Sequence, residues 1–275
     1  MPAVRPAAVA GMFYPEAPAA LAAEVRAYVS GVPPLAEGAA RPKALIVPHA
    51  GYVYSGAIAA SAYARLCTEG DAIRRVVMFG PTHRVPVRGL ALPSARAFAT
   101  PLGPVDVDRD AAASALVLAQ VCESDSAHLL EHSLEVQLPF LQTVLGEFSI
   151  VPFAVGDATP AEVAEVIDLL WGGPETLILI SSDMSHYHRY TEACEIDRAT
   201  ANAVLALSST LDNEQACGAT PINGLLMAAR RRGLRPELLD LRNSGDIAGD
   251  KSRVVGYASF VFNEDLLDRA SGVHA

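Results

Sequence analysis

Short apolar runs alternate along the chain with segments whose apolar residues recur at helical spacing. The runs at residues 44–47, 75–80 and 177–181 are almost continuously apolar, as in strands buried on both faces. Segments with helical spacing, such as residues 18–30 and 159–170, precede or separate them. We therefore predict an α/β fold in which residues 1–275 form a single domain, with a central, mostly parallel sheet and helices on both faces.

Capping residues and helix breakers set the limits of the other elements. We predict helices at residues 55–69 with Ser55 as N-cap, at 108–121 with Asp108 as N-cap, and at 131–145 with an interruption at Pro139. The remaining segments show neither helical spacing nor a strand-like apolar run. We predict loops at 97–103 and 243–250, a linker at 31–41, an extended lead-in at 1–17 and a frayed tail at 263–275.

The composition narrows the class of protein. The chain has 275 residues, of which 51% are hydrophobic, and a formal net charge of −10, so its surface repels phosphate backbones and we expect no nucleic-acid partner. Its four cysteines form no C-x-x-C pair, which favours a reducing cytoplasm over a disulfide framework. No signal peptide is evident and no apolar run reaches the length of a membrane helix, so we expect no membrane association.

Ionisable residues follow the three apolar runs at the same kind of position. His49 follows the first run, His83 the second, and Asp183 and His186 the third. Since sites in open α/β sheets lie beyond the carboxyl ends of parallel strands, we expect these residues to converge. Neutral imidazole is a common ligand of Zn, Fe and Cu, although a single histidine after a strand is often structural and Asp183 is equally suited to cap a helix.

Two further residues are candidates for chemistry. Ser133 and Glu135 fit a capped helix start, but this interpretation leaves His132 unexplained, and His132 is suited to general acid–base catalysis. Cys217 precedes a predicted helix N-terminus, where a lowered thiol pKa would favour metal binding; an inert buried cysteine is the alternative. The chain has no G-x-S-x-G, G-x-x-x-x-G-K-[ST] or G-x-G-x-x-G motif, which argues against a serine hydrolase, a P-loop NTPase and a Rossmann dehydrogenase.

Seven motifs in fixed order resemble the Memo family, whose microbial members are known as AmmeMemoRadiSam system protein B. They are VRPAAVAGMFYP, VPHAGYVYSG, FGPTH, EHSLEVQLPFL, SSDMSHY, CGATPI and NSGD. The resemblance implies a fold similar to the class III extradiol ring-cleaving dioxygenases. It also implies a pathway link to radical-SAM and AMMECR-type proteins, although this chain has no C-x₃-C-x₂-C motif of its own.

The same resemblance implies a metal pocket formed by His49, His83 and Cys217, with Asp183 and His186 on its wall and His132 close by. The dioxygenases hold iron with two histidines and a carboxylate, so a Cys217 thiolate departs from them and Asp183 is its rival as third ligand. A thiolate is softer than a carboxylate and changes the preferred metal.

The sequence is compatible with three functions. The first is an oxidoreductase dependent on Fe(II), or on Cu, that acts on a small molecule, with Asp183, His186 and His132 orienting substrate and moving protons. The second is a non-catalytic module that binds a ligand or phosphopeptide, with the loop at residues 243–246 receiving an anion. The third is a Zn²⁺-assisted hydrolase.

Overall fold

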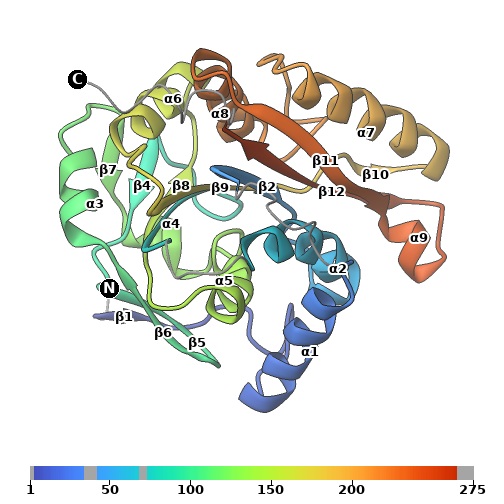
Figure 1. Cartoon of the computed structure of the whole chain (residues 1–275), viewed down its shortest axis with the longest axis horizontal. Coiled ribbons are helices and arrows are strands. Elements are labelled where there is room, and N and C mark those ends of the chain that lie inside the picture. The colour runs from blue at the N-terminus through green and yellow to red at the C-terminus, as the bar shows by residue number, and fades with distance from the viewer. Residues whose placement is uncertain (1–2, 34–41, 68–72, 265–275) are drawn as a thin grey trace.

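A large mixed β-sheet runs through the middle of the molecule, which is shown in Figure 1. The computed structural model describes residues 3–33, 42–67 and 73–264. The main path of the sheet has the order β1-β5-β6-β8-β3-β9-β2-β12-β10, while β11 pairs with β12 and β4 joins β8 to β7. The strands are β1 (Val4–Arg5), β2 (Ala44–Val47), β3 (Arg75–Pro81), β4 (Leu90–Leu92), β5 (Ala97–Thr100), β6 (Gly103–Val107), β7 (Val121–Glu123), β8 (Ser149–Val155), β9 (Thr176–Ser181), β10 (His186–His188), β11 (Arg235–Asn243) and β12 (Val254–Asn263).

The centre of the sheet is parallel, as predicted. Strands β8, β3, β9 and β2 run in one direction, with Val77 of β3 aligned with Val151 of β8 and Ile178 of β9. Strand β12 then lies antiparallel to β2 and carries β11 and β10. The carboxyl ends of β3, β9 and β2 are consequently neighbours at one edge of the parallel region.

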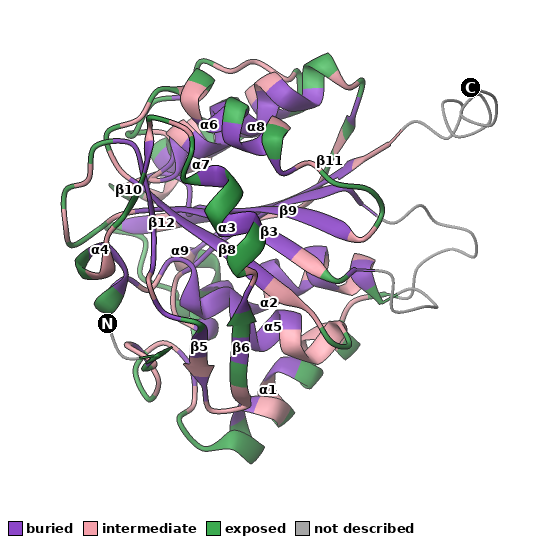
Figure 2. Cartoon of the chain, turned by 90° about the vertical axis from the view of Figure 1, so that its left-hand side faces the viewer, coloured by how far each residue is buried: buried purple, intermediate pink, exposed green. Residues whose placement is uncertain are grey.

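Helices cover both faces of the sheet, which confirms the predicted layers of this single α/β domain. Leu45 and Val47 of β2 pack into the core on one face, while Ala44 and Ile46 pack into the core on the other. Figure 2 shows α6 and α8 above the sheet and α1, α2 and α5 below it. The helices are α1 (Pro18–Ser30), α2 (Tyr52–Tyr63), α3 (Arg109–Ala115), α4 (Asp125–Leu129), α5 (Leu138–Val144), α6 (Pro160–Leu169), α7 (Tyr190–Leu205), α8 (Ala219–Arg231) and α9 (Ser244–Ala248), with 3₁₀ turns η1 (Ala64–Leu66) and η2 (Glu135–Gln137).

Several predicted boundaries are wrong because tertiary contacts replace local capping. Helix α2 begins at Tyr52, whose backbone N–H donates to the carbonyl of Phe13, so Ser55 lies inside the helix instead of capping it. The predicted helix at 108–121 has its Asp108 cap but ends at Ala115. Residues 97–100 form a strand in a hairpin with β6 where a loop was predicted. The predicted helix end at 69, most of the linker and residues 265–275 of the tail lie outside the described residues.

The segment predicted as one helix at residues 131–145 is divided into three parts. Residues 131–134 are irregular, η2 follows, and α5 begins at Leu138 with Pro139 in its first turn, which confirms the interruption at that proline. Ser133 is not a cap, since its hydroxyl donates to the carbonyl of Pro81 at 3.0 Å. The segment is therefore attached to the end of β3 instead of extending a helix.

The N-terminal segment is fixed to this irregular stretch by a buried ion pair. Arg5 Nη1 donates to Glu135 Oε2 at 2.6 Å, and both side chains are almost fully buried. Tyr14 and the backbone N–H groups of Ala8 and Val9 also donate to the Glu135 carboxylate. The charge on Glu135 is thus compensated by one cation and three further donors, as a buried carboxylate requires.

Candidate metal site

Three neighbouring strands deliver the first site residues. His49 follows β2, His83 follows β3, and Ser181 to Asp183 lie at the end of β9, which pairs with both of the other strands. Because parallel strands end at the same edge, side chains far apart in the sequence meet here. The predicted convergence of His49, His83 and Asp183 is therefore found in the structure.

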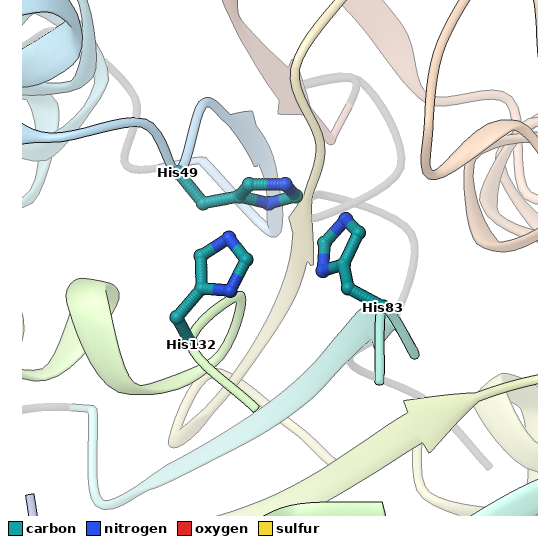
Figure 3. Close-up of side chains that lie close together, drawn as sticks. All are labelled: His49, His83 and His132. Atoms are coloured by element: carbon teal, nitrogen blue, oxygen red, sulfur yellow. The ribbon is translucent and has the colours of Figure 1, made fainter. Parts of the chain in front are cut away.

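His132 completes a cluster of three imidazoles. It reaches the strand ends from the irregular stretch before η2, and one ligand nitrogen of each ring lies within 4.8 Å of those of the other two. Figure 3 shows the three rings turned toward one another. The ring centroids of His83 and His132 are 4.6 Å apart, and the His49 ring stands edge-on to both. Such a group of nitrogens is able to hold a transition-metal ion.

A buried hydrogen-bond chain fixes the tautomer of His49. The Ser181 hydroxyl donates its only hydrogen to the carbonyl of Ser133 at 2.6 Å, so it accepts at the 2.9 Å contact with His49 Nδ1. Nδ1 therefore carries the proton and Nε2 carries the lone pair. Gln137 donates to the same Ser181 hydroxyl and accepts from Tyr63, which holds the serine in place.

Glu131 orients the other two histidines. Its carboxylate accepts from Nδ1 of His83 at 2.8 Å and from the backbone N–H groups of His83, His132 and Ser133. Since a carboxylate only accepts, His83 Nδ1 is protonated and its Nε2 is left as the free ligand atom. Carboxylate–histidine pairs of this kind commonly stand behind bound metal ions.

Burial keeps two of the imidazoles neutral. Loss of hydration, followed by the charge of His83, lowers the pKa of His49 to about 3, and loss of hydration with the charge of His49 lowers the pKa of His132 to about 4. Burial alone would raise the pKa of Glu131, but its hydrogen bonds to His83 and the backbone outweigh this effect and lower it to about 2. At neutral pH the site thus combines two neutral imidazoles, His49 and His132, with the Glu131 carboxylate anion.

Cys217 lies beside His49, in the turn before α8. Its Sγ is 3.3 Å from His49 Nε2, and the Ser182 hydroxyl is 3.8 Å from the sulfur. Burial, reinforced by the Asp183 carboxyl, raises the pKa of the thiol to about 12. The expectation of a lowered pKa at a helix N-terminus is therefore wrong, because burial outweighs the helix dipole.

Asp183 and His186 differ in how closely they join the cluster. Asp183 is buried, and its Oδ1 accepts from the backbone N–H of His49 at 2.7 Å. Burial raises the pKa of Asp183. His186 lies half-buried in β10, opposite Val255, and within the described residues its ring has no hydrogen-bond partner.

The segment 243–246 is a helix start instead of the predicted loop. The Asn243 side chain accepts from the Gly245 N–H, and the Asp246 carboxylate accepts from the Asn243 N–H and from the Tyr190 hydroxyl. These polar groups form the cap of α9, so they are already engaged in hydrogen bonds within the protein. The contribution of this segment to an anion site therefore has no support in its geometry.

Sequence reasoning missed the residues that orient the ligands. Glu131 and Gln137 lie in the same polar stretch of the sequence as His132, but neither was given a role of its own, and Ser181 was not singled out. A carboxylate directly beside His132 was an available signal for Glu131. The roles of Ser181 and Gln137 depend on the contact between the ends of β9 and β2 and the stretch before α5, which no local pattern encodes.

Comparison with known proteins shows extensive similarity to one family. Residues 5–261 match the family described as Memo-like protein. A MEMO1 family protein of Methanosarcina mazei is 37% identical over 276 residues, covering 94% of this chain and 98% of the relative. Others, from Methanosarcina acetivorans and Sulfolobus acidocaldarius, are 39% and 35% identical over 78% and 80% of this chain and 84% and 82% of their own. The chain belongs to the Memo family.

Proposed function

We propose that this protein is a metal-dependent oxidoreductase whose ion is bound by His49, His83 and Cys217, with His132 within reach of the same ion. The observation that carries the proposal is the convergence of three imidazole nitrogens within 4.8 Å at the edge of a parallel sheet. Two of these rings are held neutral, and the hydrogen bonds from His49 to Ser181 and from His83 to Glu131 engage Nδ1, which leaves Nε2 of each ring as the ligand atom.

The separation of His49 and Cys217 fits a shared ion. Ligands at roughly 2.0 Å for nitrogen and 2.3 Å for sulfur lie about 3.5 Å apart around a tetrahedral ion. His49 Nε2 and Cys217 Sγ are 3.3 Å apart. The raised thiol pKa belongs to the metal-free state, because a coordinating cation deprotonates a thiol outright.

The donor set favours Fe(II), Cu or Zn²⁺ over hard cations such as Mg²⁺. A bound iron or copper ion would supply one-electron chemistry to the site. Asp183 and His186 would orient a small-molecule substrate, and His132 would hold or release a proton at its imidazole nitrogen. A pocket of about 210 Å³ lies beside Cys217 between the ends of β3 and β8 and the start of α8, and it has room for a small molecule.

Elemental analysis of anaerobically purified protein without a metal-chelating tag tests the proposal. We expect near-stoichiometric iron in the wild type and its loss in His49→Ala, His83→Ala and Cys217→Ser, with His132→Ala showing whether that ring is also a ligand. The matched control is His188→Ala, which removes a half-buried histidine paired with Glu192 outside the cluster and should keep the metal.

The outcomes separate the candidate functions. Iron or copper together with O₂ consumption supports the oxidoreductase. Zinc with hydrolytic activity would transfer the same donor set to a metal-assisted hydrolase, since two histidines, one cysteine and an open position also suit catalytic zinc. Folded wild-type protein that takes up none of these ions would overturn the proposal and leave a ligand-binding module.

A further inference from the structure

Tyr257 is a deeply buried tyrosine whose hydroxyl has no hydrogen-bond partner within the described residues. It lies in β12 and is only 2% exposed. The other tyrosines buried to this extent all donate: Tyr14 to Glu135, Tyr52 to the carbonyl of Val136, and Tyr63 to Gln137. Because buried hydroxyls normally find a partner, the exception requires an explanation.

The hydroxyl of Tyr257 is not fully enclosed by the protein. In the described part of the chain, the fully enclosed side-chain polar atoms without a partner are the hydroxyls of Ser185 and Ser259. Tyr257 is not one of them, so the little surface that this side chain exposes includes its hydroxyl. The group is therefore available to something other than the protein.

The sheet register places Tyr257 beside the metal site. Strand β12 is antiparallel to β2, with Phe260 opposite Ile46 and Phe262 opposite Ala44. Nearer the start of β12, the Gly256 N–H donates to the carbonyl of Ser185 and the Gly256 carbonyl accepts from the Met184 N–H, so Tyr257 adjoins the segment that carries Asp183. Side chains alternate along a strand, so Tyr257 points to the same face as Val261, where α2 packs against β12.

Asp183 supplies an acceptor near this donor. Burial and then the Asp183 carboxyl raise the pKa of Tyr257, so the two groups are close enough to interact and the hydroxyl stays protonated. Asp183 Oδ1 already accepts from His49, while Oδ2 has no hydrogen bond from any described residue. The nearby Tyr54 of α2 and Tyr187 of β10 also raise the pKa of Tyr257. A free donor and a free acceptor thus adjoin the imidazole cluster.

We propose that the Tyr257 hydroxyl donates a hydrogen bond to an oxygen of the ligand bound at the imidazole cluster, while Asp183 Oδ2 accepts from the same ligand. A single ligand hydroxyl group satisfies both, so the site selects small molecules that carry a hydroxyl beside a second, metal-binding oxygen. This inference rests on the proposed metal site. It adds Tyr257 as a contact residue and a chemical class of ligand.

The test uses two metal-binding probes on the iron-loaded protein. Acetohydroxamate offers a hydroxyl and a second oxygen, whereas azide binds the metal without offering a hydroxyl. We expect Tyr257→Phe to weaken acetohydroxamate binding about 10-fold in a spectroscopic titration, the effect of one lost hydrogen bond, and to leave azide affinity and iron content unchanged. Equal acetohydroxamate affinity in the wild type and the variant would overturn the inference while leaving the metal site intact.

Metal-free protein provides a second readout. Tyr257→Phe removes a hydroxyl without a protein partner, so its Tm should equal or exceed that of the wild type. The matched control Tyr52→Phe loses its bond to the carbonyl of Val136 and should melt about 2–4 °C lower. An equal fall for Tyr257→Phe would show that its hydroxyl has a protein partner, which contradicts the inference. Absence of iron in the wild type would instead count against the metal site.

Discussion

Glu131 controls the geometry of the site although it is not itself in the imidazole cluster. Its two oxygens receive hydrogen bonds from His83 Nδ1 and from three backbone N–H groups, including that of His132. Only an ionised carboxylate accepts all four. One side chain therefore sets the His83 tautomer and the path of the segment that carries His132.

We expect Glu131→Gln to lower metal affinity about 10- to 100-fold, the usual cost of losing a carboxylate behind a histidine ligand. The amide of glutamine places its own N–H group against the backbone N–H or the Nδ1–H of His83. One hydrogen bond is therefore lost, and the ring is no longer held in its orientation. Competition with a chromophoric chelator measures the change. Glu162→Gln is the control, because Glu162 pairs with Arg88 on the surface. Unchanged affinity in Glu131→Gln would show that this carboxylate does not orient the metal ligands.

His128 should make the fold sensitive to acid. Burial lowers its pKa from 6.5 to about 4, and its Nε2–H donates to the carbonyl of Ala91. Between these values the unfolded chain binds the proton and the folded chain does not, so the free energy of unfolding falls as pH drops from about 6.5 to 4. The contribution is at most about 3 kcal/mol.

Urea denaturation at pH 7 and pH 4.5 checks this expectation for His128. The variant His128→Gln keeps a side-chain N–H for Ala91 but does not titrate. Its loss of stability between the two pH values should be smaller than that of the wild type. Parallel losses in both proteins would assign the acid sensitivity to other groups.

Residue types at strand ends were sufficient to find His49, His83 and Asp183, because the end of a buried strand is visible in the sequence. The orienting groups were not found in this way. Ser181 looks like the last residue of an apolar run, and its role comes from contacts with Ser133 and Gln137 on another segment. Contacts across such distances have no local signature.

At the scale of elements, the start of helix α6 is determined by the local sequence. Thr159 accepts from the N–H of Glu162, and the Glu162 carboxylate accepts from the N–H of Thr159, which forms a capping box. Thr159→Ala should cost about 1 kcal/mol in the free energy of unfolding, measured by chemical denaturation. Ser124→Ala is the matched control, since Ser124 precedes α4 without a side-chain capping bond. Similar losses in both variants would contradict the role of the box.

Elements whose ends depend on local bonds were predicted well, and those fixed by distant contacts were not. Helix α1 has the predicted limits of Pro18 and Ser30. Helix α2 begins earlier than predicted because Phe13, from another part of the chain, accepts its first N–H. The stretch before α5 has the composition of a helix, but its polar groups bond to β3 and to the N-terminal segment instead.

For the whole molecule, the Arg5–Glu135 pair joins parts of the chain that are 130 residues apart. Replacing Arg5 with Leu leaves the Glu135 carboxylate buried without its cation, which should cost about 3–5 kcal/mol in the free energy of unfolding. Urea denaturation measures this loss. In Arg5→Leu/Glu135→Gln the penalty should be smaller than the sum of the single changes. Additive losses would mean that the two side chains do not act as a pair.

The layered architecture was predictable because the alternation of apolar runs and helical segments defines an α/β sheet. The strand order was not predictable from that pattern. Strand β9 lies between β3 and β2 although it follows both in the chain, and this insertion brings Ser181 under His49. Among the described helices, none has the length and apolar character needed to cross a membrane.

The ion pair of Arg5 also has a consequence for synthesis. Glu135 leaves the ribosome roughly ten seconds after Arg5 at ordinary rates of translation, so Arg5 is without its counter-ion during that interval. His49 and His83 are made in the same interval, before His132. An ion that met the growing chain early would find two of the three imidazoles, and the complete site forms only after the segment that fixes the N-terminus has emerged.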